Sequence, residues 1–368
     1  MKEVRFGIVG IGNMGKGHIE NFEKGKIKGA RLVAVCDVVE SKKDEYPNYK
    51  FYTDYKEMID SGEIDAVIIA VPHYGHTYVG IYALEHGIHT IVEKPISAHK
   101  ADCEKLIAAH KDKNIVFSAM FNQRTIPQHI KIKSLIPEVG AIQRITMIAT
   151  HWFRSQAYYN SGTWRATWDG EGGGVLLNQM PHHLDLFQWL CGMPSSVRAT
   201  CTLGKYHDIE VEDDVNATLF YDNGAVGNII TTTGEFPGSF HLEIAGDKGQ
   251  IVFRDGVIRV IKNEMSVREF DRTNTNDWGN PKIESDVSYR EEMLQHLDQH
   301  ANITQNVVNA ILYGEKLIAP AEEGINSVEL ANAMILSSMK DKTVSLPMDS
   351  EEYKDLLFKL IEDKKKNL

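Results

Sequence analysis

The sequence has no long apolar run, no signal-peptide pattern at its start and only four cysteines, none of them in a CxxC pair. A membrane-spanning helix needs ~20 apolar residues, which excludes a transmembrane protein. Scattered cysteines argue against a disulfide framework and against a zinc site. We therefore expect a soluble, cytoplasmic protein without a bound metal.

Runs of positive charge are also scarce. The net charge is −11, and the only basic run is the three lysines at 364–366, which are typical of a solvated helix end. An acidic chain repels phosphate backbones, so we exclude a nucleic-acid partner. The 368 residues, 42% of them hydrophobic, fit an ordinary globular protein of two domains.

What the sequence does contain is a glycine-rich turn between a strand and a helix. The apolar run 4–9 enters a GxGxxG pattern, and a helical stretch follows. The first glycine suits a tight turn, the second a close pyrophosphate, and the third the packing of helix on strand. The helix start would offer free N–H groups to that pyrophosphate. We predict dinucleotide contacts for Gly10, Ile11, Gly12, Asn13, Met14 and Gly15.

A second predicted strand, 31–36, ends at Asp37. This acid follows the glycines at about the 20-residue distance of the carboxylate that binds an adenosine ribose. A carboxylate there repels a 2′-phosphate, and Val38 and Val39 offer no arginine to hold one. We therefore expect NAD as the cofactor and favour it over NADP. The alternative is a turn or helix-capping aspartate.

Further strands and helices alternate through the first half of the chain. This alternation predicts a doubly wound parallel sheet, which is a Rossmann domain over residues 1–124. Ligands of such sheets bind beyond the carboxyl ends of the strands. The residues near these ends that we predict to contact the cofactor are Val71, Pro72, His73, His76, Glu93, Lys94, Asn122 and Arg124, with Gln123 assigned to the substrate.

The alternation of strands and helices ends after Pro127, where predicted short strands follow one another. Asn223-Gly224 is a hairpin signal, because both residues tolerate positive φ. Consecutive hairpins predict an α+β domain over 125–368 with a large open antiparallel sheet, and pairing of copies as a homodimer or homotetramer would cover its free face. The predicted strands are 142–150, 197–203, 215–220, 225–233, 241–245, 250–254 and 257–261, and a helix over 351–366 closes the chain.

Lys94, in the tripeptide Glu93-Lys94-Pro95, is the first candidate for chemistry. Removal of hydride from a carbinol requires the hydroxyl proton to leave, so a base must touch that oxygen. A partly desolvated lysine beside a positive nicotinamide has its pKa lowered toward a useful value. The alternative is a surface lysine that follows a strand.

A second candidate lies on a helical stretch after Glu171 and a glycine run. Proline is tolerated near a helix start, so Pro181 places the first turn close to Asn178, a candidate N-cap. His182 would then lie near the positive helix end, which favours a neutral imidazole that accepts or relays a proton. A satisfied core histidine is the alternative, and a metal site that includes His183 is disfavoured because the two rings diverge.

Aromatic and arginine residues gather upstream of the glycine run. Aromatic faces with fixed donors nearby suit sugar rings, although an interdomain packing patch would have the same composition. The predicted substrate-binding residues are Lys94, Gln123, Arg154, Tyr159, Trp164, Arg165, Asn178 and His182.

Along essentially its full length the chain resembles the glucose–fructose oxidoreductase, inositol dehydrogenase and rhizopine-catabolism (Gfo/Idh/MocA) family. The motifs GIVGIGNMGKGH, VPHYGHT, VEKPIS and WRATWDGEGGGVLLNQMPHHLDLFQWL carry the resemblance. It implies a Rossmann domain, a sheet domain that forms dimers or tetramers, and Lys94 as the catalytic base or proton relay. The family's aspartate–histidine motif falls on Asn178 and His182. The asparagine is a departure: it cannot raise the basicity of the site, so Asn178 is assigned to substrate hydroxyls.

The leading hypothesis is an NAD(P)-dependent oxidoreductase that interconverts a secondary alcohol and a ketone on a sugar, glycoside or cyclitol by hydride transfer. A redox-neutral enzyme that modifies a sugar or cleaves a glycoside with tightly bound NAD is an alternative, and release of NADH separates the two. A sensor that binds NAD without turnover belongs to another class. The presence of both Lys94 and His182 argues against it.

Overall fold

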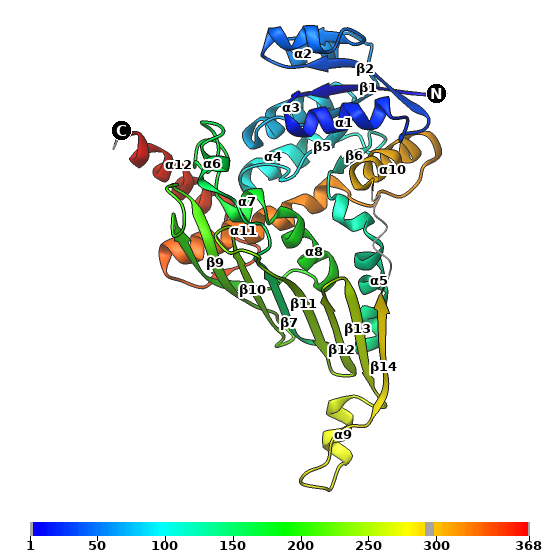
Figure 1. Ribbon diagram of the computed structural model, residues 1–368, viewed down its shortest axis with the longest axis vertical. Helices are drawn as coiled ribbons and strands as arrows, with labels where there is room; N and C mark the ends of the chain where they lie inside the picture. Colours follow the sequence, from blue (N-terminus) through cyan, green and yellow to red (C-terminus); the bar gives the residue numbers. More distant parts are fainter. Residues whose placement is uncertain (1–2, 291–297, 367–368) are drawn as a thin grey trace.

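The amino-terminal half of the chain builds a parallel sheet flanked by helices. The computed structural model describes residues 3–290 and 298–366, and within them this sheet has six strands in the order β3-β2-β1-β4-β5-β6 (Figure 1). Every neighbouring pair is parallel, which confirms the predicted Rossmann fold. The strands are β1 (Val4–Val9), β2 (Ala30–Cys36), β3 (Lys50–Tyr52), β4 (Ala66–Ile69), β5 (His89–Val92) and β6 (Phe117–Ala119). The helices between them are α1 (Asn13–Glu23), α2 (Tyr55–Asp60), α3 (His73–Glu85) and α4 (Lys100–Ala109).

The second sheet has nine strands in the described residues, in the order β14-β13-β12-β11-β7-β10-β9-β8-β15. All neighbours are antiparallel except β7 and β10, so the sheet is largely antiparallel, as predicted, with one parallel pair. After β7 the chain leaves the sheet over residues 150–195 and returns at β8, near the far edge. The antiparallel run β8-β9-β10 then leads back towards β7, so that β10 pairs with β7 in parallel. The strands are β7 (Ile142–Ala149), β8 (Ser196–Leu203), β9 (Glu212–Phe220), β10 (Val226–Thr232), β11 (Phe240–Gly246), β12 (Gly249–Arg254), β13 (Val257–Asn263), β14 (Ile283–Arg290) and β15 (Val344–Ser345).

Helices cover one face of this sheet and leave the other open (Figure 1). Successive side chains of β10 point to opposite faces of the sheet: Ile229 is buried, whereas Ile230 is 38% exposed. The short helix α9 (Val267–Thr273) projects beyond the edge strand β14. The other helices of this half are α5 (Pro127–Leu135), α6 (Gln156–Tyr159), α7 (Val175–Asn178), α8 (Pro181–Cys191), α11 (Gly324–Lys340) and α12 (Ser350–Lys366).

The predicted helix around His182 is divided in two. Asn178 ends α7, and α8 begins at Pro181 with Met180 as its N-cap. The prediction of Asn178 as the N-cap is therefore wrong, because the missing N–H of Pro181 starts a new helix three residues later. This break frees the end of α7 for contacts with the first domain.

Two hydrophobic cores lie beneath the two sheets, and the chain returns to the first one late. Helix α10 (Gln299–Tyr313) contributes Ile303, Val307 and Val308 to the core of the Rossmann sheet. A single boundary at residue 124 therefore leaves out a helix that packs on the first domain. No helix of residues 3–290 or 298–366 combines the length and apolar character needed to span a bilayer.

Candidate active site

The glycine-rich turn leaves space in front of the first helix. Gly10 has φ +92°, and a β-carbon there would lie 2.6 Å from the carbonyl oxygen of Ala70. A β-carbon on Gly15 would lie 2.0 Å from the oxygen of Gly10, so helix and strand pack as closely as predicted. A β-carbon on Gly12 would have no neighbour within 4 Å. This cradle fits a pyrophosphate held by the N-terminus of α1.

Asp37 follows β2 and lies against the same turn. Its Oδ2 accepts hydrogen bonds from the backbone N–H of Ile11 at 2.9 Å and from Nζ of Lys42 at 2.6 Å. Burial raises the pKa of Asp37, but the hydrogen bonds from Lys42, Val39 and Ile11 outweigh it and lower the pKa below its ordinary value. Asp37 is therefore a carboxylate at neutral pH. Sequence reasoning overlooked Lys42, a cation that could also face a 2′-phosphate.

The residues that follow β4 and β5 converge on one edge of the sheet. Nε2 of His18 lies 2.8 Å from Oε1 of Glu93. Burial raises the pKa of Glu93, but the hydrogen bond and charge of His18 and the charges of His300 and Lys94 together outweigh it and lower the pKa to about 2. Nδ1 of His73 lies 2.9 Å from the carbonyl oxygen of Glu171, and Nδ1 of His76 lies 2.7 Å from that of Pro95. Burial lowers the pKa of both imidazoles, so they are neutral.

Several predicted site residues carry buried polar atoms that have no hydrogen-bond partner among residues 3–290 and 298–366. Buried polar atoms are normally paired, so an unpaired group that borders a cleft marks a place for a ligand atom. Asn122 is a clear case, because its Nδ2 donates to Gln299 at 3.1 Å while its Oδ1 has no partner in the described part of the chain. The unpaired atoms among the predicted site residues are His76 Nε2, Asn122 Oδ1, Gln123 Oε1, Arg154 Nε and His182 Nδ1.

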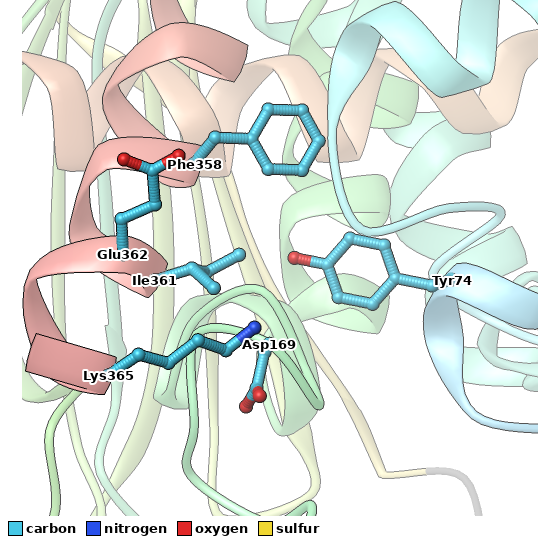
Figure 2. Close-up of a pocket in the computed structure, with 6 residues that line it drawn as sticks. All are labelled: Tyr74, Asp169, Phe358, Ile361, Glu362 and Lys365. Atoms are coloured by element: carbon cyan, nitrogen blue, oxygen red, sulfur yellow. The ribbon is translucent and has the colours of Figure 1, made fainter. Parts of the chain in front are cut away.

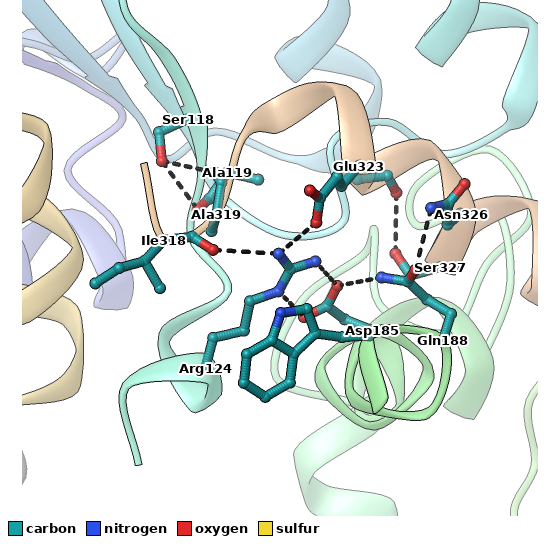
Figure 3. A network of polar contacts seen from close by, with 12 residues as sticks. Ser118, Ala119, Arg124, Asp185, Gln188, Ile318, Ala319, Glu323, Asn326 and Ser327 are labelled. Carbon is teal, nitrogen blue, oxygen red and sulfur yellow. Dashed lines mark hydrogen bonds and ion pairs between the residues drawn. The ribbon is translucent and has the colours of Figure 1, made fainter. Parts of the chain in front are cut away.

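Arg124 departs from its predicted role beside the cofactor. Its side chain is 1% exposed, and its Nε and Nη2 donate to the two carboxylate oxygens of Asp185 at 2.8 and 2.6 Å (Figure 3). Nη1 donates to Glu323 at 2.5 Å and to the carbonyl oxygen of Ile318 at 3.2 Å. All three guanidinium nitrogens are thus engaged within the protein. Arg124 ties the first domain to α8 and α11, and we correct its assignment to a structural one.

Lys94 crosses from the first domain to the second. It follows β5, and its Nζ donates to the backbone oxygen of Asn178, the last residue of α7, at 3.0 Å. Burial lowers the pKa of Lys94, the charges of Glu93 and Glu171 raise it, and Arg154 lowers it further. The net direction is downward, as the sequence predicted for a proton-transfer lysine.

His182 occupies the first turn of α8 on the same seam between the domains. Its pKa lies well below the ordinary value, first because of burial and second because of the positive charge of Lys94. The imidazole is therefore neutral, as predicted, although burial rather than the helix end is the main cause. Its ring lies 6.5 Å from that of Phe121, which follows β6. The structure thus brings Lys94 and His182 together from different domains.

Glu171 is a buried carboxylate to which the sequence analysis gave no role. It is 2% exposed, its Oε2 accepts from the backbone N–H of Ala166 at 2.6 Å, and its Oε1 accepts from Nδ2 of Asn178. Burial raises its pKa, and the hydrogen bonds from Ala166 and Asn178 oppose this shift. A lone glutamate before a glycine run carries no local signal for these contacts, because they depend on the fold of the loop.

The predicted aromatic and arginine residues divide into two groups. The guanidinium groups of Arg154 and Arg165 lie over the ring of Tyr158 at 5.0 and 4.5 Å, and Arg165 also stacks on Trp164. The ring of Trp164 lies 6.5 Å from that of His73, which links this group to the cofactor edge. The hydroxyl of Tyr159, in contrast, hydrogen-bonds Thr233 at 2.8 Å and is buried, so Tyr159 supports the loop.

A separate pocket of about 390 Å³ lies between α12 and the start of α3 (Figure 2). Tyr74, Phe358 and Ile361 point toward one another across it, and Lys365 and Asp169 border its rim. None of its lining residues is a predicted cofactor or substrate residue. This pocket is therefore distinct from the seam that holds Lys94 and His182.

Family models match most of the chain. The model described as "Oxidoreductase family, NAD-binding Rossmann fold" matches residues 4–121. The model described as "Oxidoreductase family, C-terminal alpha/beta domain" matches residues 133–346. The two matches follow each other along the chain in the order of its two sheets.

Curated relatives and a solved structure agree with these models. A levoglucosan dehydrogenase from Pseudarthrobacter phenanthrenivorans is 30% identical over 55% of this chain and 58% of its own length. An inositol 2-dehydrogenase from Salmonella typhimurium is 27% identical over 51% of this chain and 54% of its own length. These alignments therefore span little more than half of each relative. The WlbA dehydrogenase from Bordetella pertussis, solved with NADH and UDP-GlcNAcA, is 25% identical with a TM-score of 0.77, covering 94% of this chain and 100% of its own. The chain belongs to the Gfo/Idh/MocA oxidoreductase family.

Proposed function

We propose that the protein is an NAD-dependent dehydrogenase that interconverts a secondary alcohol and a ketone on a sugar, glycoside or cyclitol. The observation that carries this proposal is the convergence of Lys94 and His182 on one interdomain seam beside the carboxyl ends of β5 and β6. The names of the relatives, levoglucosan and inositol dehydrogenases, support ring alcohols as the substrate class.

The residues of the first domain fit NAD. The turn at Gly10, Gly12 and Gly15 would hold the pyrophosphate, and Asp37 would accept the ribose hydroxyls. The unpaired Oδ1 of Asn122 and Nε2 of His76 offer polar contacts nearer the strand ends. When bound, NAD supplies the ring that accepts or returns hydride.

Lys94 and His182 would handle the proton. A lysine whose pKa is lowered can accept the hydroxyl proton as the carbon is oxidised, and the ammonium can return it in the opposite direction. A neutral His182 can hydrogen-bond the same oxygen or pass the proton onward. Arg154, Arg165 and Trp164 would orient the remaining hydroxyls and exclude water from the seam.

Replacing Lys94 tests this assignment. Lys94→Ala should lower kcat roughly 10²- to 10⁴-fold, the usual contribution of a positioned general base, while NADH affinity measured by fluorescence stays nearly constant. The assay is NADH formation with aldoses, inositols and glycosides, each with NAD and with NADP. Lys105→Ala, an exposed lysine on α4, is the control for simple loss of a cation. An unchanged rate in Lys94→Ala would refute the role.

We further propose that the protein acts in the cytoplasm as a homodimer or homotetramer joined through the open face of the larger sheet. The four cysteines are free, which suits a reducing compartment. The open face carries Ile230, whose exposure favours burial against a second copy. Sedimentation should show an oligomer that Ile230→Glu weakens, whereas a monomer at micromolar concentration would contradict the proposal.

A further inference from the structure

Asn178 is the point where Lys94 and Glu171 meet. The backbone oxygen of Asn178 accepts a hydrogen bond from the ammonium group of Lys94 at 3.0 Å. The side-chain Nδ2 of Asn178 donates a hydrogen bond to Oε1 of Glu171. The other carboxylate oxygen of Glu171 is held by the backbone N–H of Ala166 at 2.6 Å. One asparagine therefore joins the ammonium and the carboxylate, and both carboxylate oxygens are fixed in place.

Two carboxylates, and not Asn178 itself, supply negative charge to the surroundings of Lys94. Burial destabilises the ammonium form of Lys94, and the carboxylates of Glu93 and Glu171 oppose this effect. Glu93 is bound by His18 on the side of the first domain. Glu171 is the carboxylate that acts from the second domain, where the substrate would lie.

We infer that Glu171 is the positioning residue of Lys94. From seven residues upstream it supplies the carboxylate that Asn178 lacks, and its hydrogen bond with the Asn178 side chain fixes the residue whose backbone oxygen binds the Lys94 ammonium group. The inference deepens the proposed function, since the base it positions is Lys94. Glu171 does this through Asn178, with its own oxygens committed to Asn178 and Ala166.

Other charged and titratable groups face this pair, and the substitution Glu171→Gln leaves each of them in place. They belong to α3, α8, β9, α10 and the loops that follow β5 and β7. The groups are Glu93, His73, His76, Arg154, Arg165, His182, Glu212 and His300.

The test is the pH midpoint at which Lys94 becomes reactive, measured on the full-length protein without substrate. Competitive acetylation with acetic anhydride over a pH series, followed by mass spectrometry of the Lys94 peptide, reports the neutral amine. Glu171→Gln removes the negative charge, so the ammonium is less stable and the midpoint should fall by ~1 pH unit. A purely structural glutamate would change folding without moving the midpoint.

An exchange of the two side chains provides the rescue. In the double variant Glu171→Gln/Asn178→Asp, the new amide can donate to the new carboxylate and still accept from the N–H of Ala166. Both hydrogen bonds survive while the charge moves to position 178, so the midpoint should return to within a few tenths of the wild-type value. If Glu171→Gln fails to fold, this variant alone carries the test, and a midpoint ~1 unit below wild type would contradict the inference.

Glu212→Gln is the matched control. Glu212 is also buried and bonds the other end of α7, but Lys94 is not among the groups that it faces most closely. The midpoint of Lys94 should stay unchanged in this variant. An unmoved midpoint in Glu171→Gln, or an equal shift in Glu212→Gln, would overturn the inference. Absence of turnover with every sugar would instead refute the proposed function and leave the labelling result intact.

Discussion

Two glycine-rich turns of this protein look alike but face different partners. The turn at Gly10–Gly15 leads into α1 and includes its first residues, and the turn at Gly172–Gly174 precedes α7. Both contain a glycine of positive φ, +92° at Gly10 and +78° at Gly172. In both, a β-carbon on the last glycine would strike a backbone oxygen, at 2.0 Å for Gly15 and 1.9 Å for Gly174.

The difference lies at the helix starts. In front of α1, Gly12 borders open space, and no side chain caps the helix. In front of α7, Oε1 of Glu212 accepts from the N–H groups of Gly174 and Leu176 at 2.8 and 3.0 Å. The first turn is therefore open to a ligand in front of α1, although Asp37 accepts the N–H of Ile11 beside it, whereas the start of α7 is closed by the carboxyl group of Glu212. A glycine-rich turn becomes a binding site only when the protein leaves its donors unfilled.

The largest expected effect tests the closed turn. Gly174→Ala would drive its β-carbon into the backbone oxygen of Glu212, which cannot move without displacing β9. Such overpacking should lower the free energy of unfolding by at least ~3 kcal/mol in urea titrations. Gly173→Ala, whose β-carbon would meet only side chains at 3.3 Å or more, should cost clearly less. An equal loss of unfolding free energy in the two variants would show that the close contact with the backbone of Glu212 is not the reason for glycine at position 174.

The pH dependence of stability tests the carboxylate that closes the turn. Burial raises the pKa of Glu212 to about 7 from an ordinary 4.5, so between these values the folded protein holds a proton that the unfolded chain has lost. The free energy of unfolding contributed by Glu212 therefore falls as the pH rises through that window. Glu212→Gln keeps the acceptor oxygen and should become more stable than wild type by about 2 to 3 kcal/mol at about pH 8, with little difference at about pH 4. Urea unfolding at both pH values measures this, and parallel pH profiles would contradict it.

The same contrast explains what could be predicted from the sequence. The GxGxxG turn and the parallel sheet follow from local patterns, because the relevant contacts lie within one strand–turn–helix unit. The direction of the pKa shifts of Lys94 and His182 was also predicted, but their main cause, burial at the seam between the domains, depends on the fold. The contacts of Glu171 and Glu212 join segments far apart in the fold, and they have no periodic signal. Arg124 was assigned to the cofactor for its place after a strand, yet its partner Asp185 lies 61 residues away.

Gly12→Ala tests the open turn and should separate binding from stability. Its β-carbon meets nothing within 4 Å, and its φ of −84° suits alanine, so the melting temperature should change by no more than ~2 °C. The added methyl group would occupy the space where the pyrophosphate approaches, so we expect NADH to bind roughly 10-fold more weakly. Gly17→Ala, which also meets no neighbour, is the matched control and should leave NADH affinity unchanged. Loss of stability rather than affinity in Gly12→Ala would place the open turn in the same class as the closed one.

The smallest expected effect concerns Lys42, the cation beside the open turn. Its Nζ binds Oδ2 of Asp37 at 2.6 Å and the backbone oxygen of Ile11 at 3.1 Å, so it lies where a 2′-phosphate of NADP would approach. Lys42→Ala removes an attraction for that phosphate and leaves Asp37 unneutralised, and both changes disfavour NADP. The ratio of kcat/KM for NADP to that for NAD should fall ~5-fold, the equivalent of about 1 kcal/mol for a partly exposed pair. Lys43→Ala, which replaces the exposed neighbour, should leave the ratio unchanged, whereas a constant ratio in Lys42→Ala would mean that Asp37 alone decides between the two cofactors.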